Sequence, residues 1–279
     1  MSQYFYPFEA ENPTSRSYYE DEEEQTTLEQ YQEESMWSSP VFRLSPLMKQ
    51  APKLSAELLL IGLPGSGALF LNAIFPQKML VGLLLMPDAS SSGNPFSSDM
   101  ARPGTAVYRE KSNPNILVAM CWNAVAPERA VSWAQCLSQN VDARRIVILD
   151  SLSASRYRPA EYETDQVSPP WLRQLSTTGS AKVDSIPTLE APNMLTGMGA
   201  ALLNKMEMKQ HTATYCYSSL LEQAHGKDLA SQESLVAYEP ILKSFDIKCE
   251  TSSKKYTSAL NAYFTHFKDQ FRTDKSIYL

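Results

Sequence analysis

The fold of this 279-residue chain is decided at Ala56-Glu-Leu-Leu-Leu-Ile-Gly62, a short apolar run that ends in glycine. The segment Ala68-Leu-Phe-Leu-Asn-Ala-Ile74 follows it and has helical character. An apolar run that leads through a glycine turn into a helix is typical of a buried strand in a sheet covered by helices. We therefore predict an α/β fold.

The same alternation of strands and helices continues outward from this junction. The sequence predicts further strands at 79–85, 105–109, 116–122, 145–150 and 212–217, and helices at 127–137, 197–208, 232–245 and 253–271. Strands that are apolar on both faces, with helices between them, are typical of sheets that are at least partly parallel. We expect a single three-layer α/β/α domain.

Composition divides the chain into three parts. Residues 1–52 are rich in Glu, Ser, Gln and Tyr and lack a sustained hydrophobic period, which predicts a disordered acidic tail. Within this tail, residues 37–44 can pack as an extended arm, because large apolar side chains seldom stay fully exposed. Residues 53–271 are predicted to form the α/β domain, with a Pro-, Ser- and Thr-rich insertion at 151–192. Residues 272–279 are predicted to be a short flexible docking tail.

Charge and hydropathy argue against several classes of protein. Residues 1–40 carry ten acidic side chains and one basic side chain, whereas the whole chain has a net charge of -6, so the remainder sums to +3. This distribution lacks the basic stripe of a nucleic-acid-binding protein. No apolar run reaches the roughly 20 residues of a membrane-spanning helix, and the N-terminus lacks a signal-peptide pattern. We expect a cytoplasmic protein that binds neither nucleic acid nor membranes.

The turn Gly62-Leu-Pro-Gly-Ser-Gly67 could cradle a phosphate, because backbone N–H groups gather where a strand leads into a helix. However, Ala68 and Leu69 stand where a Walker A loop requires Lys and Ser or Thr. Phe70 stands at the third glycine of a dinucleotide fingerprint. Two interpretations stay open: a tight strand-to-helix turn, and the cradle of a phosphate- or nucleoside-handling enzyme.

Histidines and cysteines give no support for a catalytic or metal site. His211, His225 and His266 have no partner that the sequence ties to them, and neither a G-x-S-x-G nor an H-E-x-x-H motif is present. The cysteines lie far apart without a CxxC pair, so we expect free thiols in the core: Cys121, Cys136, Cys216 and Cys249. We expect no catalytic residues, no metal and no cofactor.

The chain ends in Ile277-Tyr278-Leu279, after the polar segment 272–276. An exposed apolar-Tyr-X terminus can dock in a pocket, with the tyrosine as a wedge and the carboxylate bound by a lysine or by backbone N–H groups. The predicted last helix carries an aromatic and apolar face that is either core or a groove for a partner helix: Tyr256, Leu260, Tyr263, Phe264 and Phe267.

Several short segments follow one another in a distinctive order. They are Leu189-Glu-Ala-Pro-Asn-Met194, Ala200-Ala-Leu-Leu203, Thr212-Ala-Thr-Tyr-Cys-Tyr217 and Ala237-Tyr-Glu-Pro-Ile-Leu242. Three further matches are Lys111-Ser-Asn-Pro114 before an apolar strand, Ser276-Ile-Tyr278 at the C-terminal end, and the acidic N-terminal tail. Together, across residues 105–279, they resemble the family of proteasome assembly chaperone 1, the first subunit of the heterodimeric proteasome assembly chaperone.

The resemblance implies an α/β core related in shape to nucleoside phosphorylases but without their active site, and a protein that is not an enzyme. It implies a heterodimer with proteasome assembly chaperone 2, docked on the outer face of the α-subunit ring of the proteasome core particle, where it prevents off-pathway association of α-subunits. The family's hydrophobic-Tyr-X docking motif carries over to Ile277 at the pocket lip, Tyr278 as the wedge and the Leu279 carboxylate facing a lysine. The implied compartments are the cytoplasm and the nucleus.

Overall fold

The centre of the sheet is formed by the strand that the sequence singles out. In the computed structural model, β2 (Leu54–Gly62) pairs in parallel with β6 (Val141–Ser153), with a register that runs from Leu54↔Val141 to Gly62↔Leu149. The last five residues of β2 are all buried. A strand that is buried on both faces needs helices above and below it, which the chain supplies.

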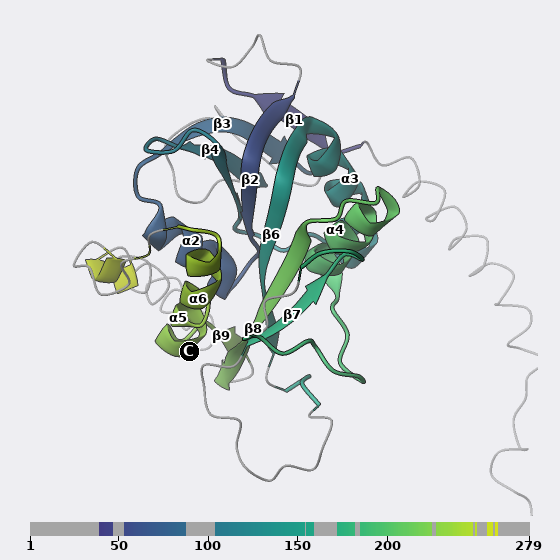
Figure 1. Cartoon of the computed structure of the whole chain (residues 1–279), viewed down its shortest axis with the longest axis vertical. Coiled ribbons are helices and arrows are strands. Elements are labelled where there is room, and N and C mark those ends of the chain that lie inside the picture. The colour runs from purple at the N-terminus through teal and green to yellow at the C-terminus, as the bar shows by residue number, and fades with distance from the viewer. Residues whose placement is uncertain are drawn as a thin grey trace, which may run out of the picture. The chain divides into compact units, whose positions relative to one another are not determined.

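The described residues form one mixed sheet in the strand order β1-β3-β4-β5-β2-β6-β8-β7 (Figure 1). The remaining strands are β1 (Val41–Leu44), β3 (Lys78–Leu85), β4 (Thr105–Glu110), β5 (Ile116–Cys121), β7 (Leu172–Ser176), β8 (Thr214–Ala224) and β9 (Lys227–Leu229), which pairs with β8. The central strands β5, β2, β6 and β8 are parallel, and the outer pairs are antiparallel. The predicted partly parallel sheet is confirmed.

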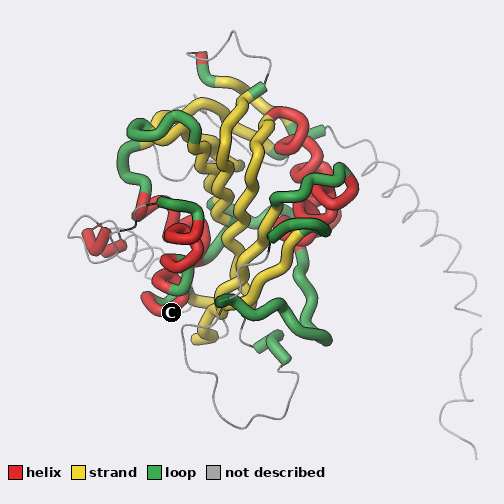
Figure 2. Tube along the Cα trace, viewed as in Figure 1, coloured by secondary structure: helices red, strands yellow, loops and turns green. Residues whose placement is uncertain are grey.

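Helices cover both faces of this sheet (Figures 1 and 2). On one face lie α2 (Ser66–Ile74), α5 (Gln232–Val236) and α6 (Glu239–Ser244). On the other lie α3 (Ala130–Asn140), preceded by the 3-10 helix η2 (Pro127–Arg129), and α4 (Gly197–Met208). The predicted three-layer α/β/α architecture is confirmed.

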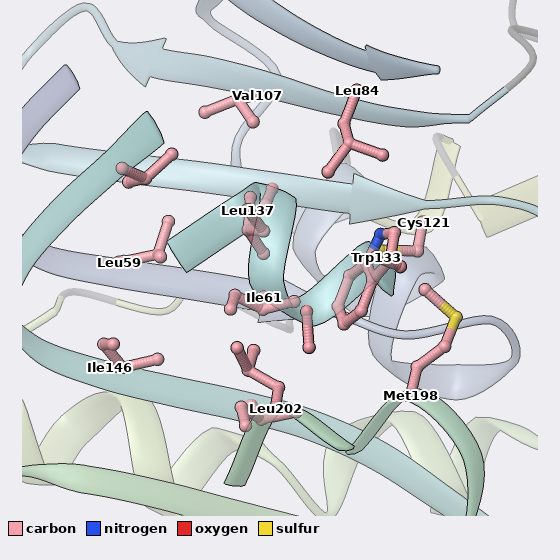
Figure 3. Close-up of a cluster of buried hydrophobic side chains, with 14 of the residues drawn as sticks. Leu59, Ile61, Leu84, Val107, Cys121, Trp133, Leu137, Ile146, Met198 and Leu202 are labelled. Atoms are coloured by element: carbon pink, nitrogen blue, oxygen red, sulfur yellow. The ribbon is translucent and has the colours of Figure 1, made fainter. Parts of the chain in front are cut away.

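Alternate residues of the strands build two separate cores. On β2, Leu59 and Ile61 face α3 and α4, whereas Leu58 and Leu60 belong to the cluster on the α2 side. Figure 3 shows the first cluster, in which the fully buried Trp133 donates its Nε1–H to Thr105 Oγ1 at 2.9 Å. Each large apolar side chain buried in this way contributes about 1.5–3 kcal/mol of stability relative to exposure.

The structure describes residues 39–46, 53–87, 104–153, 155–158, 172–181, 185–224, 227–247, 249, 256–258 and 260–261. Most of the predicted acidic tail lies outside these ranges, but Val41–Leu44, part of the expected extended arm, forms β1 and pairs with β3. The predicted helix 253–271 is described at only five positions, and the docking tail 272–279 lies entirely outside. No helix in the described part has the length and apolar character needed to cross a membrane.

Two predicted segments differ in detail from the structure. The segment 151–192 is not a plain insertion, because β6 extends to Ser153 and Leu172–Ser176 forms β7 at the sheet edge. Edge strands are often short and polar, and therefore lack the apolar signal of a central strand. The predicted helix 232–245 is divided into α5 and α6, because Pro240 has no N–H and starts a new helix.

Candidate functional site

The glycine turn Gly62–Gly67 joins β2 to α2. Gly65 precedes the helix with a φ of 108°, a left-handed conformation that favours glycine. Gly67 approaches β6 so closely that a Cβ atom built on it would lie 2.1 Å from the Leu149 carbonyl oxygen. The glycines therefore allow the turn to pack directly against the β6 backbone, which supports the tight-turn interpretation.

The first residue of α2 enters a buried network of hydroxyl groups. Ser66 Oγ lies 2.8 Å from Ser219 Oγ on β8 and 2.9 Å from the Tyr238 hydroxyl. Ser219 donates to the Tyr238 oxygen at 2.8 Å, and Tyr238 donates to the main-chain carbonyl of Asp150. All three hydroxyl-bearing side chains are buried and have partners within the protein. The network connects α2, β6, β8 and the start of α6, which is a structural role.

Asp150 places an acidic side chain at the carboxyl end of β6. Its Oδ1 accepts a hydrogen bond from the Ser151 N–H at 2.8 Å. Its Oδ2 faces Gly199 in the first turn of α4, where an added Cβ would lie 2.3 Å away, so only glycine leaves room for the carboxyl group. Burial raises the pKa of Asp150 to about 7, although the Ser151 hydrogen bond acts in the opposite direction. Strongly shifted pKa values are common among catalytic residues, which makes Asp150 a candidate.

The groups near Asp150 do not supply an activated nucleophile. Burial raises the pKa of the Cys121 thiol to about 12 and that of Cys216 well above its usual range, and the Asp150 charge adds to both shifts. Burial also raises the pKa of the Tyr238 hydroxyl. These shifts keep each group neutral, and a neutral thiol is a poor nucleophile. The predicted free thiols are confirmed, with Cys249 only half-buried and the other three buried.

An open hollow of about 750 Å³ lies at the opposite end of the parallel strands. It is lined by Ser55, Ala56, Glu57, Asn115, Asp142, Ala143, Arg144 and His211. The His211 ring is held at both nitrogens, with Nδ1 2.8 Å from Thr214 Oγ1 and Nε2 2.9 Å from the Ala143 carbonyl oxygen. Because a carbonyl only accepts, Nε2 carries the proton. Ligands of α/β sheets bind beyond the carboxyl ends of the strands, and this hollow lies at the amino ends.

A second polar cluster holds the loop that leads into α4. On β7, Arg173 donates through Nε to Glu190 Oε2 at 2.7 Å and through Nη2 to the Tyr157 hydroxyl at 3.0 Å. Asn193 Nδ2 donates to the Arg158 carbonyl at 2.6 Å, and Arg158 N donates back to Asn193 Oδ1 at 2.7 Å. The turn at Pro192-Asn193 therefore links the residues after β6 to β7 at the edge of the sheet.

The predicted docking residues Ile277, Tyr278 and Leu279 lie outside the described residues, as do His225 and His266, so their roles stay predictions. On the predicted last helix, Tyr256 and Leu260 are described and buried. The Tyr256 ring lies 6.5 Å from that of Phe70 in an edge-on arrangement. Core packing, rather than a partner groove, is the interpretation that these two residues support.

Comparison with known proteins identifies the family. A family model with the short name PAC1, described as proteasome assembly chaperone 4, matches residues 82–275. The chain belongs to this family of proteasome assembly chaperones. The curated relatives that it matches are named proteasome assembly chaperone 1.

The curated relatives are similar to the chain over part of their length. The relative from Danio rerio is 30% identical over 139 residues, which is 48% of this chain and 48% of that protein. The relative from Homo sapiens is 28% identical over 148 residues, which is 50% of this chain and 48% of that protein. The chain spans about half the length of the curated relatives it matches.

Solved structures share the fold at low sequence identity. A protein of unknown function from Thermoplasma acidophilum has a TM-score of 0.58 at 18% identity, over 83% of this chain and 91% of that one. Pyrococcus furiosus PbaA, an archaeal homolog of proteasome-assembly chaperone, has a TM-score of 0.55 at 15% identity, over 84% of this chain and 95% of that one. Pyrococcus furiosus PbaB, an archaeal proteasome activator, has a TM-score of 0.53 at 11% identity, over 85% of this chain and 99% of that one. These likenesses confirm the predicted fold class.

Proposed function

We propose that the chain is a non-enzymatic subunit of a proteasome assembly chaperone, active in the cytoplasm and nucleus. It pairs with a second chaperone subunit of similar fold, binds α-subunits of the proteasome core particle and prevents their off-pathway association. The observation that carries this proposal is the family match over residues 82–275. Relatives named proteasome assembly chaperone 1 and the fold shared with PbaA support it.

The chemistry of the described residues supports a scaffold rather than an enzyme. The conspicuous polar groups at the carboxyl ends of the parallel strands are bonded to one another, with Ser66, Ser219 and Tyr238 satisfied inside the protein. The Cys121 and Cys216 thiols there are held neutral by burial. The glycine turn, which the phosphate-binding alternative requires, is used for packing against Leu149. A phosphate- or nucleoside-handling enzyme is therefore the weaker interpretation.

In this proposal the C-terminal residues anchor the chaperone to the α-subunit ring. Ile277 fills the apolar lip of a pocket, Tyr278 wedges against its wall, and the Leu279 carboxylate pairs with a lysine between neighbouring α-subunits. A charge-assisted contact of this kind is stronger than a neutral hydrogen bond. Because the carboxylate belongs to the backbone, the Leu279 side chain contributes little.

Point variants of the tail test this anchor. We expect Tyr278→Ala to weaken binding of the purified protein to isolated proteasome core particles about tenfold or more, measured by biolayer interferometry, because hot-spot aromatic residues dominate such contacts. Leu279→Ala is the matched control, since it keeps the terminal carboxylate, and should bind like the unaltered protein. Tyr278→Ala binding as tightly as Leu279→Ala would contradict the anchoring role. Equal melting temperatures would show that the fold does not depend on the tail.

A further inference from the structure

Strand β1 closes one edge of the sheet and is attached to it along one side only. Among the described strands it pairs with β3 alone, in an antiparallel register from Val41↔Leu85 to Leu44↔Gly82. On its other side, β3 is held by β4 over a longer register (Figure 1). No other strand of the described sheet therefore depends on β1 for its hydrogen bonds.

Side chains of β1 alternate between solvent and core. Val41 and Arg43 are exposed, whereas Phe42 and Leu44 are half-buried and pack against the core cluster on the α3 and α4 side of the sheet. The Phe42 ring lies over Gly82, where an added Cβ would come within 2.6 Å of the ring Cζ atom and force the ring to move. A glycine in a strand often marks such a close approach. The β3 edge therefore has a slot for one aromatic side chain.

Two hydrogen bonds flank the strand. At one end, Cys136 Sγ on α3 donates to the Pro40 carbonyl oxygen at 3.5 Å, and a thiol is a weak donor. At the other end, the Ser45 N–H donates to the Val81 carbonyl oxygen at 2.9 Å. Segments with few buried apolar contacts open at a lower free energy than central strands. β1 has two half-buried apolar side chains and is a segment of this kind, whereas the last five residues of β2 are all buried.

The backbone of β3 carries two sets of amides that report on different neighbours. Hydrogen-bonded and non-hydrogen-bonded pairs alternate along an antiparallel ladder. The bond from Ser45 to Val81 fixes this alternation, so the N–H groups of Leu83 and Leu85 face β1. The N–H group of Leu84, between them, faces β4. Loss of β1 alone would expose the first two N–H groups and leave that of Leu84 bonded.

We propose that residues 40–45 form a detachable strap, which leaves the β3 edge as one unit while the rest of the sheet stays folded and uncovers a site for an extended peptide strand. Strand addition requires a row of unpaired backbone groups, which Leu83 and Leu85 supply once the strap opens. The slot at Gly82 selects a strand with an aromatic side chain at the facing position. The strand that fits both features is the strap itself, through its backbone and Phe42, so it is an internal competitor for this site.

Hydrogen exchange of the unaltered full chain, read amide by amide by NMR, tests whether the strap detaches. After correction for intrinsic rates, the N–H groups of Leu83 and Leu85 should exchange about tenfold faster than that of Leu84, or more. Urea below the unfolding transition should accelerate these two amides only slightly, because local opening exposes little surface. Exchange of all three amides at one rate would overturn the strap, since β1 would then be lost only together with β3 or with the whole fold.

Replacement of the aromatic ring should favour the open state. The Phe42 ring lies over Gly82 only when the strap is closed, so Phe42→Ala should accelerate exchange at Leu83 and Leu85 about tenfold. Arg43→Ala is the matched control, because it truncates an exposed side chain of the same strand, and exchange should stay within about twofold of the unaltered protein. Equal acceleration by the two variants would contradict the role of the slot.

A synthetic peptide with the sequence of residues 39–46 tests whether the uncovered edge accepts a strand. Added at millimolar concentration to the full-length Phe42→Ala protein, it should slow exchange at Leu83 and Leu85 about threefold or more, because a ligand of the open state protects the edge that it covers. The same peptide with Phe42→Ala is the control and should leave the exchange rates unchanged. Equal protection by both peptides, or protection by neither, would overturn the aromatic-selective site.

Discussion

Replacing the buried carboxyl group of Asp150 by an amide should change how stability depends on pH. Burial raises the pKa of this group to about 7, whereas an aspartate in water has a pKa of about 3.9. Because the folded state binds the proton more tightly than the unfolded state, the protonated carboxyl stabilises the fold at low pH. That contribution is complete below about pH 4 and is lost as the pH rises through about 7.

The size of the effect follows from the shift in pKa. One unit corresponds to about 1.4 kcal/mol, so the loss of stability between pH 4 and pH 8 is at most about 4 kcal/mol. The part of the Asp150 side chain that remains accessible reduces this value. Asp150→Asn keeps an oxygen to accept the Ser151 N–H but cannot ionise, so the variant should be more stable than the unaltered protein at pH 8.

Urea unfolding followed by circular dichroism at pH 5, 6, 7 and 8 measures this difference. The gap between the unaltered protein and Asp150→Asn should widen with pH by about 2 kcal/mol or more. Asp142→Asn, at an exposed position near the start of β6, is the control and should follow the pH curve of the unaltered protein. Parallel curves for Asp150→Asn and the unaltered protein would refute the assigned environment of Asp150.

Two further predictions concern the glycine turn. Gly67→Ala places a methyl group 2.1 Å from the Leu149 carbonyl oxygen and should lower the free energy of unfolding by about 3 kcal/mol. Gly197→Ala, at the start of α4, is the control: an added Cβ meets nothing within 4 Å there, but φ is 63°, so the free energy of unfolding should fall by only about 1 kcal/mol. Equal losses of stability for the two variants in urea unfolding would contradict the close packing of the turn. Millimolar adenosine nucleotides or inorganic phosphate should leave the melting temperature unchanged, because no ligand-binding role is assigned to this turn; a rise of several degrees would favour the enzyme alternative.

The sequence predicts most of the fold because apolar runs mark central strands clearly. Helix 197–208 is found at the predicted bounds, as Gly197–Met208. The start of β6 lies outside the predicted strand 145–150, because buried Val141 and Ala143 alternate there with exposed Asp142 and Arg144, ahead of the continuous apolar run 146–149. The edge strand β7 carries too few apolar side chains to be recognised.

The polar network could not be predicted in the same way. Ser66, Ser219 and Tyr238 come from elements that are far apart in the chain, and only the parallel topology brings their ends together. Tyr238 is part of a segment that resembles the family, but nothing in the sequence assigns its hydroxyl to the Asp150 carbonyl. The expected extended arm contains Phe42, whereas the place of its ring over Gly82 becomes known only from the structure.

Recovery of proteasome subunits from a cell extract is the decisive measurement for the proposed function. Full-length protein and a version without Ile277–Leu279 serve as baits, and the bound chains are identified by mass spectrometry. The full-length bait should recover a second assembly chaperone and core-particle α-subunits, and the shortened bait should keep the chaperone but lose much of the α-subunits. Failure of both baits to recover proteasome subunits would contradict the assembly-chaperone function and return attention to the glycine turn as a ligand site.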